Sequence, residues 1–321
     1  MKLGRQTTLG SHTAVSGVGV HSGEPATLTM LPAAADTGIV FVRCNDGRPG
    51  REIRADVRAV TATEFATVLG DATGPLCSTA EHVLAALSGL GVDNAIIEID
   101  GPEVPIMDGS ASAFVAAIDK VGIVTLSAPR RCIKVLKPVR VFMDDAYGEL
   151  RPNPDGFRVE LEIAFDNPLI GRQSLALDVT SDTFRRELAR ARTFGFMRDV
   201  ARLWLAGYAL GASFDNTLVV SDSRVLSPEG LRYPDEFVRH KALDAVGDLA
   251  LAGAPLLGVY RSVRGGHKLN HAVLSALMAD ASAWTLVADA EHRPQAARRA
   301  IRGHADVGIG LVAPAYAPDV S

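Results

Sequence analysis

Histidine and aspartate recur at helical spacing in the segment 236–248. His240, Asp244 and Asp248 are each separated by four residues, so on an α-helix they drift by only about 40° per step and project from one side. Imidazole nitrogen and carboxylate oxygen are both zinc ligands, and a catalytic zinc takes about three protein ligands and leaves one position open. The helix therefore offers two ligands of such a site, although the same pair is also typical of a surface contact or a capped core histidine.

Glu81 and His82 form a second pair, at the predicted start of another helix. Ser78 and Glu81 fit the Ser-x-x-Glu capping box, which explains the glutamate as a capping residue but does not explain His82. In zinc hydrolases, one residue of such a pair holds the metal while its neighbour takes the proton from the metal-bound water. His82 is therefore a candidate third ligand, and Glu81 is a candidate base.

Two further histidines lie in glycine-containing turns. Gly265 and Gly266 precede His267, and glycine lets a backbone approach a ligand closely, so beside a metal cleft His267 is a candidate acid. Asp248 is available to fix its tautomer. His21 lies between two predicted strands, where a lone histidine is usually structural. The histidines without such companions are interpreted as structural or solvated: His12, His271, His292 and His304.

The composition is ordinary for a soluble globular enzyme. The 321 residues are 47% hydrophobic and 22% charged, and the length predicts about two domains. The net charge of -4 gives no basic field, so we expect no nucleic-acid partner, and no protein partner is inferred. We find no signal-type segment and no run of about 18 apolar residues, so we expect a cytoplasmic protein without a transmembrane segment. An odd number of cysteines without CxxC spacing suggests neither a disulfide framework nor a thiolate zinc site.

The predicted elements follow the same order in both halves of the chain: a helix with a histidine, a glycine stop, a strand, a loop and a second helix. In the first half the stop, strand, loop and second helix are 89–91, 94–99, 101–110 and 111–120. In the second half the helix ends at Gly253. The strand is 256–260, the loop is 264–267, and the next helix ends at Ala279. This repeat predicts an α+β fold of two similar units stacked face to face. A site between them would collect His82 from one unit and His240 with Asp244 from the other.

The polar segment 126–131 is predicted to be a linker between the two units. The first α+β unit would then be residues 1–126, with the Glu-His motif, and the second residues 132–321, with the His-Lys-x-x-Asp helix and an apolar insertion ahead of it. Within that insertion, Leu203–Leu210 is expected to be a core helix.

Four motifs together resemble the zinc-dependent UDP-3-O-acyl-N-acetylglucosamine deacetylases, which catalyse the committed step of lipid A synthesis in Gram-negative bacteria. The motifs are Ser78-Thr-Ala-Glu-His82, Arg192-Thr-Phe-Gly-Phe, the stretch Phe237–Asp248, and Gly266-His-Lys-Leu-Asn. The resemblance extends from Gln6 to Asp280 and is weak over Cys44–Arg58 and after Glu291. It implies a fold of two βααβ-type units stacked as a sandwich with the active site between them, in agreement with the repeat.

The resemblance implies one Zn2+ per chain, held by His82, His240 and Asp244. It further implies that Glu81 is the general base for the metal-bound water. His267 would protonate the leaving amine or stabilise the oxyanion as imidazolium. Because the base and the acid need opposite protonation states at one pH, the sequence predicts a bell-shaped rate profile.

The remaining implied roles concern UDP-3-O-acyl-N-acetylglucosamine as the substrate. Asp248 would orient His267, Thr193 would donate a hydrogen bond to the oxyanion, and Phe194 and Lys241 would hold the sugar nucleotide. The long acyl chain needs an apolar channel, for which the candidates are Phe196, Met197, Val200 and the segment from Gly211 to Val219, including Phe214.

Two other functions are compatible with the same residues. One is a metal-dependent deacetylase of another sugar or amide substrate. The other is a non-enzymatic protein that binds sugar nucleotides or acyl chains and has a structural metal. Structural zinc sites are usually closed by four ligands, whereas three are nominated here beside a glutamate and a histidine, which favours catalysis.

Overall fold

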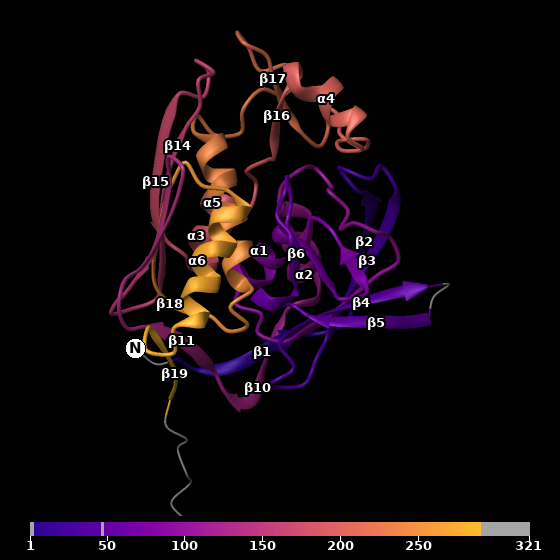
Figure 1. Ribbon diagram of the computed structural model, residues 1–321. Helices are drawn as coiled ribbons and strands as arrows, with labels where there is room; N and C mark the ends of the chain where they lie inside the picture. The colour runs from indigo at the N-terminus through magenta and orange to yellow at the C-terminus, as the bar shows by residue number, and fades with distance from the viewer. Residues whose placement is uncertain (1–2, 46–47, 290–321) are drawn as a thin grey trace, which may run out of the picture. The chain divides into compact units, whose positions relative to one another are not determined.

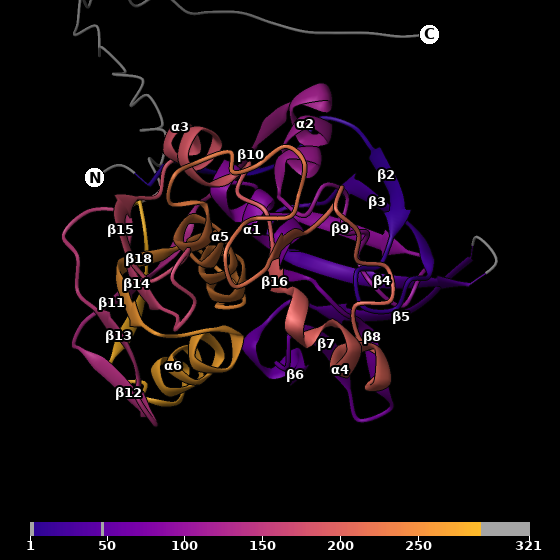
Figure 2. The same ribbon diagram turned by 90° about the horizontal axis from the view of Figure 1, so that it is seen from above.

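Helices α1 (Glu81–Leu90) and α5 (Glu236–Ala250) lie side by side in the computed structural model, which describes residues 3–45 and 48–289 (Figures 1 and 2). They are closest at Gly247, where an added Cβ would lie 2.0 Å from the carbonyl oxygen of Glu81. Only glycine allows this approach. Helix α5 is buried on both its apolar and its polar side, since Leu243, His240 and Asp244 are at most 2% exposed.

The strands of the N-terminal half form three sheets. Five strands pair in the order β2-β3-β9-β4-β5, three in the order β6-β7-β8, and β1 pairs with β10. The bounds are β1 (Arg5–Leu9), β2 (Thr13–Val18), β3 (Pro25–Pro32), β4 (Ile39–Asn45), β5 (Arg48–Arg54), β6 (Val60–Ala62), β7 (Val68–Asp71), β8 (Gly74–Cys77), β9 (Ala95–Ile99) and β10 (Ile123–Pro129). A 3-10 turn, η1 (Val57–Ala59), and helix α2 (Ser112–Val121) complete this half. Alternate residues of β3 are buried, so one face of the largest of these sheets meets the core.

The described C-terminal half is built on a seven-stranded sheet in which β18 is the hub. Strand β18 pairs antiparallel with β13 and parallel with β11 and β14. The bounds are β11 (Arg131–Val135), β12 (Val139–Met143), β13 (Ala146–Arg151), β14 (Phe157–Ala164), β15 (Arg172–Asp178), β18 (Leu256–Val263) and β19 (Trp284–Ala288). Helix α5 packs on β14 and β15, and α6 (His267–Ala279) packs on β12 and β13, so the helices cover this sheet (Figure 1). A short helical segment, α3 (Ser181–Thr183) with the π-helix η2 (Phe184–Leu188), precedes the insertion.

The insertion ahead of α5 contains two short parallel strands, β16 (Phe194–Phe196) and β17 (Leu218–Val220), joined by η3 (Met197–Asp199) and α4 (Val200–Leu205). No residue of α4 is buried, and Leu205 is 92% exposed. The expected core helix over 203–210 is therefore wrong. The helix ends early because Gly207 and Ala209 have left-handed φ values of 79° and 57°, which turn the chain back toward the loop between β2 and β3.

The fold confirms the predicted α+β class as a mixed α/β structure of helices and several sheets. The predicted order also recurs, as α1-β9-α2 in the first half and α5-β18-α6 in the second. The predicted linker segment 126–131 lies within strands, since β10 continues to Pro129 and β11 begins at Arg131, and strand pairing fixes both segments. Residues 290–321 of the predicted second unit lie outside the described residues. No helix within the described ranges is long and apolar enough to span a membrane.

Candidate metal centre

Three buried side chains from two helices form a group of candidate metal ligands. His82 comes from the first turn of α1, and His240 and Asp244 come from α5, each 2–3% exposed. The Nε2 atoms of His240 and His82 lie 3.3 Å and 3.6 Å from Oδ1 of Asp244. The two imidazole rings are nearly perpendicular, at 87°, with centroids 5.1 Å apart. One donor atom of each residue lies within 4.8 Å of the others, which is the spacing that a single ion needs.

The chemistry of these donors fits a divalent cation. Oδ1 of Asp244 and Nδ1 of His82 are buried and have no hydrogen-bond partner within residues 3–45 and 48–289. Such groups are costly when unpaired. Burial lowers the pKa of His240 to about 3, so its imidazole is neutral. Its Nδ1 lies 3.0 Å from the carbonyl oxygen of Ala191, which accepts a hydrogen bond from the protonated Nδ1 and leaves Nε2 free as a ligand.

Asp244 is held in the charged form that a metal ligand requires. Burial opposes its ionisation, but the neighbouring His240 and Lys241 outweigh burial and keep the pKa of Asp244 well below its usual range. Lys241 donates from Nζ to Oδ2 of Asp244 at 2.9 Å, and the same ammonium lies 5.7 Å from the ring centroid of Phe194. Oδ1 of the carboxylate thus remains available to an ion while Oδ2 is fixed.

A second buried group, Glu81, Asp248 and His267, lies directly beside the first. Nδ1 of His267 donates to Oδ2 of Asp248 at 2.9 Å, and its Nε2 lies 3.9 Å from Oε1 of Glu81. Burial raises the pKa of Glu81. Burial would lower the pKa of His267, but Asp248, Glu81 and Asp244 outweigh it and raise that pKa to about 9. The site therefore contains a carboxylate and an imidazolium that suit opposite steps of proton transfer.

The start of helix α1 differs from the sequence expectation. Its N-cap is Ala80, without a side-chain hydrogen bond, so the predicted capping box of Ser78 and Glu81 is wrong. Oε2 of Glu81 instead accepts a hydrogen bond from the backbone N–H of Thr67 at 3.0 Å. This partner is distant in the sequence, and no local pattern indicates it.

Both groups open into a cavity of about 230 Å³. Of the predicted residues, Thr193, Phe194 and Lys241 line it together with the metal ligands, Glu81 and His267. His21, for which a structural role was the commoner interpretation, lines it as well, and its ring packs edge-on against Tyr208 at 5.5 Å. The insertion contributes Leu203, Ala209 and Ala212 to the lining.

Ala212 and Thr217 of the segment 211–219 predicted for the acyl channel are part of this lining, whereas the five large side chains predicted for the channel lie outside it. They are Phe196, Met197, Val200, Phe214 and Val219. Met197 and Phe214 are about half exposed, at 51% and 49%. The ring of Phe196 packs near Phe165 and Phe194, so it lies beside the cavity wall.

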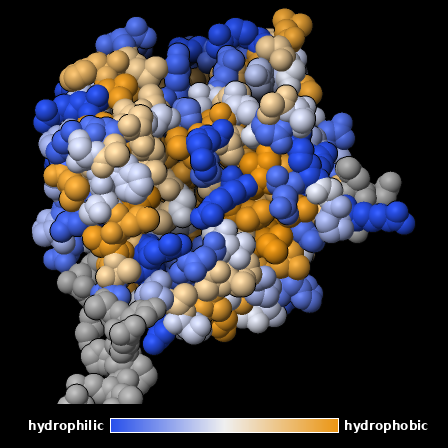
Figure 3. Space-filling model, turned by 60° about the horizontal axis from the view of Figure 1, so that its bottom comes forward, coloured by the Kyte–Doolittle hydropathy of each residue, from blue (hydrophilic) through white to orange (hydrophobic). Residues whose placement is uncertain are grey.

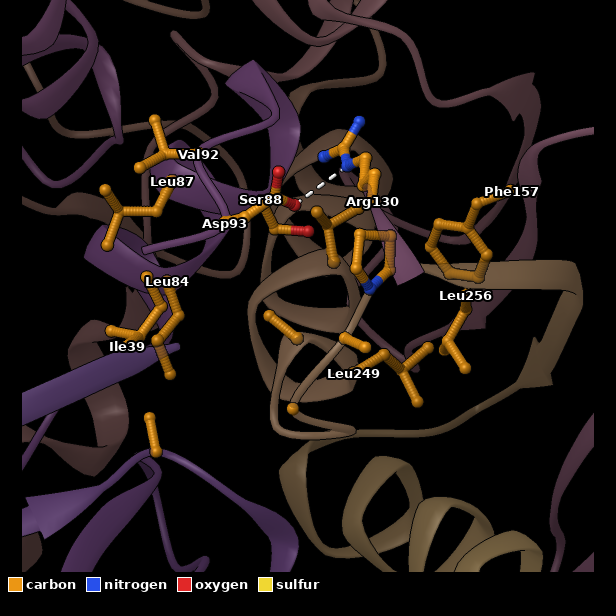
Figure 4. A pocket seen from close by; sticks show the side chains of 16 residues that line it. Ile39, Leu84, Leu87, Ser88, Val92, Asp93, Arg130, Phe157, Leu249 and Leu256 are labelled. Carbon is orange, nitrogen blue, oxygen red and sulfur yellow. Dashed lines mark hydrogen bonds and ion pairs between the residues drawn. The ribbon is translucent and has the colours of Figure 1, made fainter. Parts of the chain in front are cut away.

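Other hollows lie away from the candidate metal ligands. Figure 4 shows a cavity of about 60 Å³ beside α1 and α5, lined by apolar side chains such as Leu84 and Leu249, with the Arg130–Asp93 ion pair in its wall. A larger groove of about 850 Å³ lies between η1 and α6. Neither includes a member of the two candidate metal-binding groups found in the described residues. On the face shown in Figure 3, hydrophobic side chains gather in patches that hydrophilic side chains separate.

Sequence reasoning missed three polar residues that surround the site. Thr67 and Asn270 donate hydrogen bonds to Asp248, and Glu103 accepts hydrogen bonds from the backbone N–H groups of His21 and Ser22. Glu103 is 1% exposed. A buried carboxylate needs such donors, but the partners come from distant segments, so only the folded chain reveals them.

The fold and the site define a mixed α/β protein in which a buried glutamate and histidine, Glu81 and His267, lie beside three candidate metal ligands. Residues 6–279 match the model of the family described as "LpxC: UDP-3-O-acyl N-acetylglycosamine deacetylase". Similar proteins named UDP-3-O-acyl-N-acetylglucosamine deacetylase occur in Brucella ovis and Brucella abortus. Each is 53% identical over 283 residues, which cover 88% of this chain and 98% of the relative. The chain therefore belongs to the UDP-3-O-acyl N-acetylglycosamine deacetylase family.

Proposed function

We propose that this protein is a zinc-dependent amide hydrolase that removes acetate from UDP-3-O-acyl-N-acetylglucosamine, the committed step of lipid A synthesis. One observation supports it above all: the candidate metal ligands and the Glu81–His267 pair open into the same cavity. The family membership supports the identity of the substrate. The proposal includes the cytoplasmic location expected from the sequence.

His82, His240 and Asp244 would hold one zinc ion per chain. When bound, zinc would supply Lewis-acid polarisation of the acetamide carbonyl and would lower the pKa of a water molecule toward about 7. Two neutral imidazoles and one carboxylate are a ligand set that suits zinc. Asp244 would contribute the single negative charge of this ligand set.

Glu81 and His267 perform the proton transfers. Glu81 accepts a proton from the attacking water, whose oxygen forms a bond to the carbonyl carbon. His267 holds a proton at Nε2 and donates it to the amide nitrogen as the carbon–nitrogen bond breaks, which leaves acetate and a free amine. Asp248 keeps Nδ1 of His267 protonated through the 2.9 Å hydrogen bond, so that Nε2 faces the cavity.

The remaining side chains position the substrate. The backbone N–H of Thr193 donates to the carbonyl oxygen of Gly109 at 2.7 Å, which fixes this residue at the cavity. Its hydroxyl would donate a hydrogen bond to the oxyanion. Phe194 and Lys241 would hold the sugar nucleotide from the rim of the cavity. The acyl chain would leave the cavity along Leu203, Ala209 and Ala212 of the insertion. It would continue into the predicted channel of Phe196, Met197, Val200, Phe214 and Val219.

The proposal extends to the architecture. Residues 1–126 and 132–321 would be two similar βααβ-type units stacked as a sandwich with the active site between them. The contact of α1 with α5 supports this arrangement, since α1 contributes Glu81 and His82 while α5 and α6 contribute the other ligands and the acid.

The direct test measures zinc content and deacetylation on one preparation, before and after chelation and zinc return. We expect one zinc per chain and activity that is lost with the metal and restored with it. Glu81→Gln should keep the zinc but lose activity, because glutamine cannot accept the proton. Zinc without turnover of this substrate would favour another amide substrate, and no bound metal would refute the proposed site.

A further inference from the structure

Thr67 is a buried residue whose three polar groups all bond to the two helices of the site. It precedes β7 and is 2% exposed. Its backbone N–H donates to Oε2 of Glu81 at 3.0 Å, and its carbonyl oxygen accepts from the N–H of Ala80 at 3.2 Å. Its hydroxyl donates to Oδ1 of Asp248 at 2.6 Å. One residue thus touches both the carboxylate of the base and the carboxylate that orients the acid.

The carboxylate of Asp248 is fixed by three donors. Oδ2 accepts from Nδ1 of His267 at 2.9 Å and from Nδ2 of Asn270 at 2.8 Å. Asn270 is itself fixed, because its Oδ1 accepts from the hydroxyl of Tyr260. On Oδ1, the donor within the described ranges is the hydroxyl of Thr67. Without that hydroxyl, Oδ1 is buried and unpaired, and the carboxylate can rotate about its remaining bonds.

We propose that Thr67 is a positioning residue for both proton-transfer groups. Its N–H sets which oxygen of Glu81 faces the cavity, and its hydroxyl sets the plane of Asp248 and thereby the direction of Nε2 of His267. This inference rests on the proposed roles of those groups. Thr67 does not line the cavity, so it acts through its neighbours and not on the substrate.

Thr67→Val separates the two contributions, because valine has the shape of threonine and keeps the backbone N–H but lacks the hydroxyl. We expect kcat to fall about 10- to 100-fold, as is typical when a partner of a catalytic side chain is lost. KM should stay within about twofold, because the cavity lining is unchanged. Zinc content should stay at the wild-type value, because Thr67 bonds to Glu81, Asp248, His267 and Ala80, none of which is a proposed metal ligand.

Two controls distinguish positioning from stability. Thr67→Ser keeps the hydroxyl and should recover kcat to near the wild-type value. Thr8→Val removes a hydroxyl of similar burial that donates to the carbonyl oxygen of Asn94, far from the site in β1. It should lower the melting temperature without lowering kcat. The proposal is wrong if the activity of Thr67→Val falls only as much as its fraction of folded protein falls. It is also wrong if Thr67→Ser is as slow as Thr67→Val.

A double-mutant cycle keeps the test decisive if Thr67→Val folds poorly. Thr67→Ala and Asp248→Asn should each lower kcat, and the double variant should lose much less than the product of the two factors, because both act through His267. Fully multiplicative losses overturn the inference. Activity of the wild type is measured first: an inactive, zinc-loaded wild type refutes the proposed function, whereas an active wild type with a fully active Thr67→Val refutes only the role of Thr67.

Discussion

Gly247→Ala should disturb both the stability and the site of the protein, because it separates the two helices that carry the proposed metal ligands. The new Cβ would lie 2.0 Å from the carbonyl oxygen of Glu81, 2.8 Å from its carbonyl carbon and 3.0 Å from its Cα. These are backbone atoms, so no side-chain rotation relieves the contact. To reach van der Waals distance, one helix must move by about 1.4 Å in a closely packed interior.

The net effect combines two opposing terms. Alanine is favoured over glycine within a helix by about 1 kcal/mol, while overpacking a core costs about 1–3 kcal/mol and sometimes more. A backbone contact this short belongs at the upper end, so we expect a net loss of about 2 kcal/mol and a melting temperature about 3 °C lower. Because His82 lies on α1 while His240 and Asp244 lie on α5, the same shift separates the ligands. A displacement of about 1 Å at a site costs on the order of 100-fold in rate.

The assay measures thermal unfolding, zinc affinity and deacetylation of the same variant. Gly89→Ala is the matched control, because it also adds a methyl group to a helical glycine but meets the ring of Phe184, a side chain, and not the facing helix. It should lower stability while zinc affinity stays close to that of the wild type. A Gly247→Ala protein that is as stable as the wild type and binds zinc equally well would refute the argument that the helix contact sets the ligand spacing.

Three further predictions concern protonation, substrate length and thiol chemistry. The rate should be a bell-shaped function of pH. It should fall on the acid side as Glu81 is protonated, and on the alkaline side as His267, whose pKa is raised to about 9, loses its proton. A rate that does not change with pH through that range would contradict the proposed pairing of base and acid. Phe214→Trp or Val219→Trp should raise KM for long acyl chains much more than for short ones, and equal increases would refute the channel. The three cysteines are buried, and burial raises the pKa of Cys77 to about 12. A thiol reagent should therefore label the folded protein far more slowly than the protein in denaturant. Rapid labelling of the folded protein would refute this prediction.

Features that depend on nearby residues could be predicted from the sequence. The spacing of His240, Asp244 and Asp248 places them on one side of a helix whatever that helix packs against, and the structure has that helix over 236–250. The repeated order of helix, strand and helix could likewise be predicted, because periodicity and glycine stops are local signals. The start of β18 at Leu256 and the end of α6 at Ala279 agree with the prediction for the same reason, although β18 continues three residues beyond the predicted strand.

The predictions that failed depended on distant partners. Glu81 fits a capping box by sequence, but its carboxylate accepts a hydrogen bond from the backbone N–H of Thr67 instead. The apolar stretch after Leu203 was expected in the core, yet its helix ends after six residues and stays exposed, because the residues that follow bond to the loop between β2 and β3.

The sequence alone determined the chemistry available to this protein, since the types and helical spacing of its histidines and carboxylates are properties of short segments. Only the tertiary structure decided how that chemistry is arranged. Glu81 and Asp248 are far apart in the chain and meet through Thr67, which is 181 residues from Asp248. The distances within the proposed ion site and acid–base pair arise when α1 packs against α5 at Gly247, and burial together with the neighbouring carboxylates sets the pKa values of His240 and His267. Packing and desolvation act on the whole fold, and no local pattern encodes them.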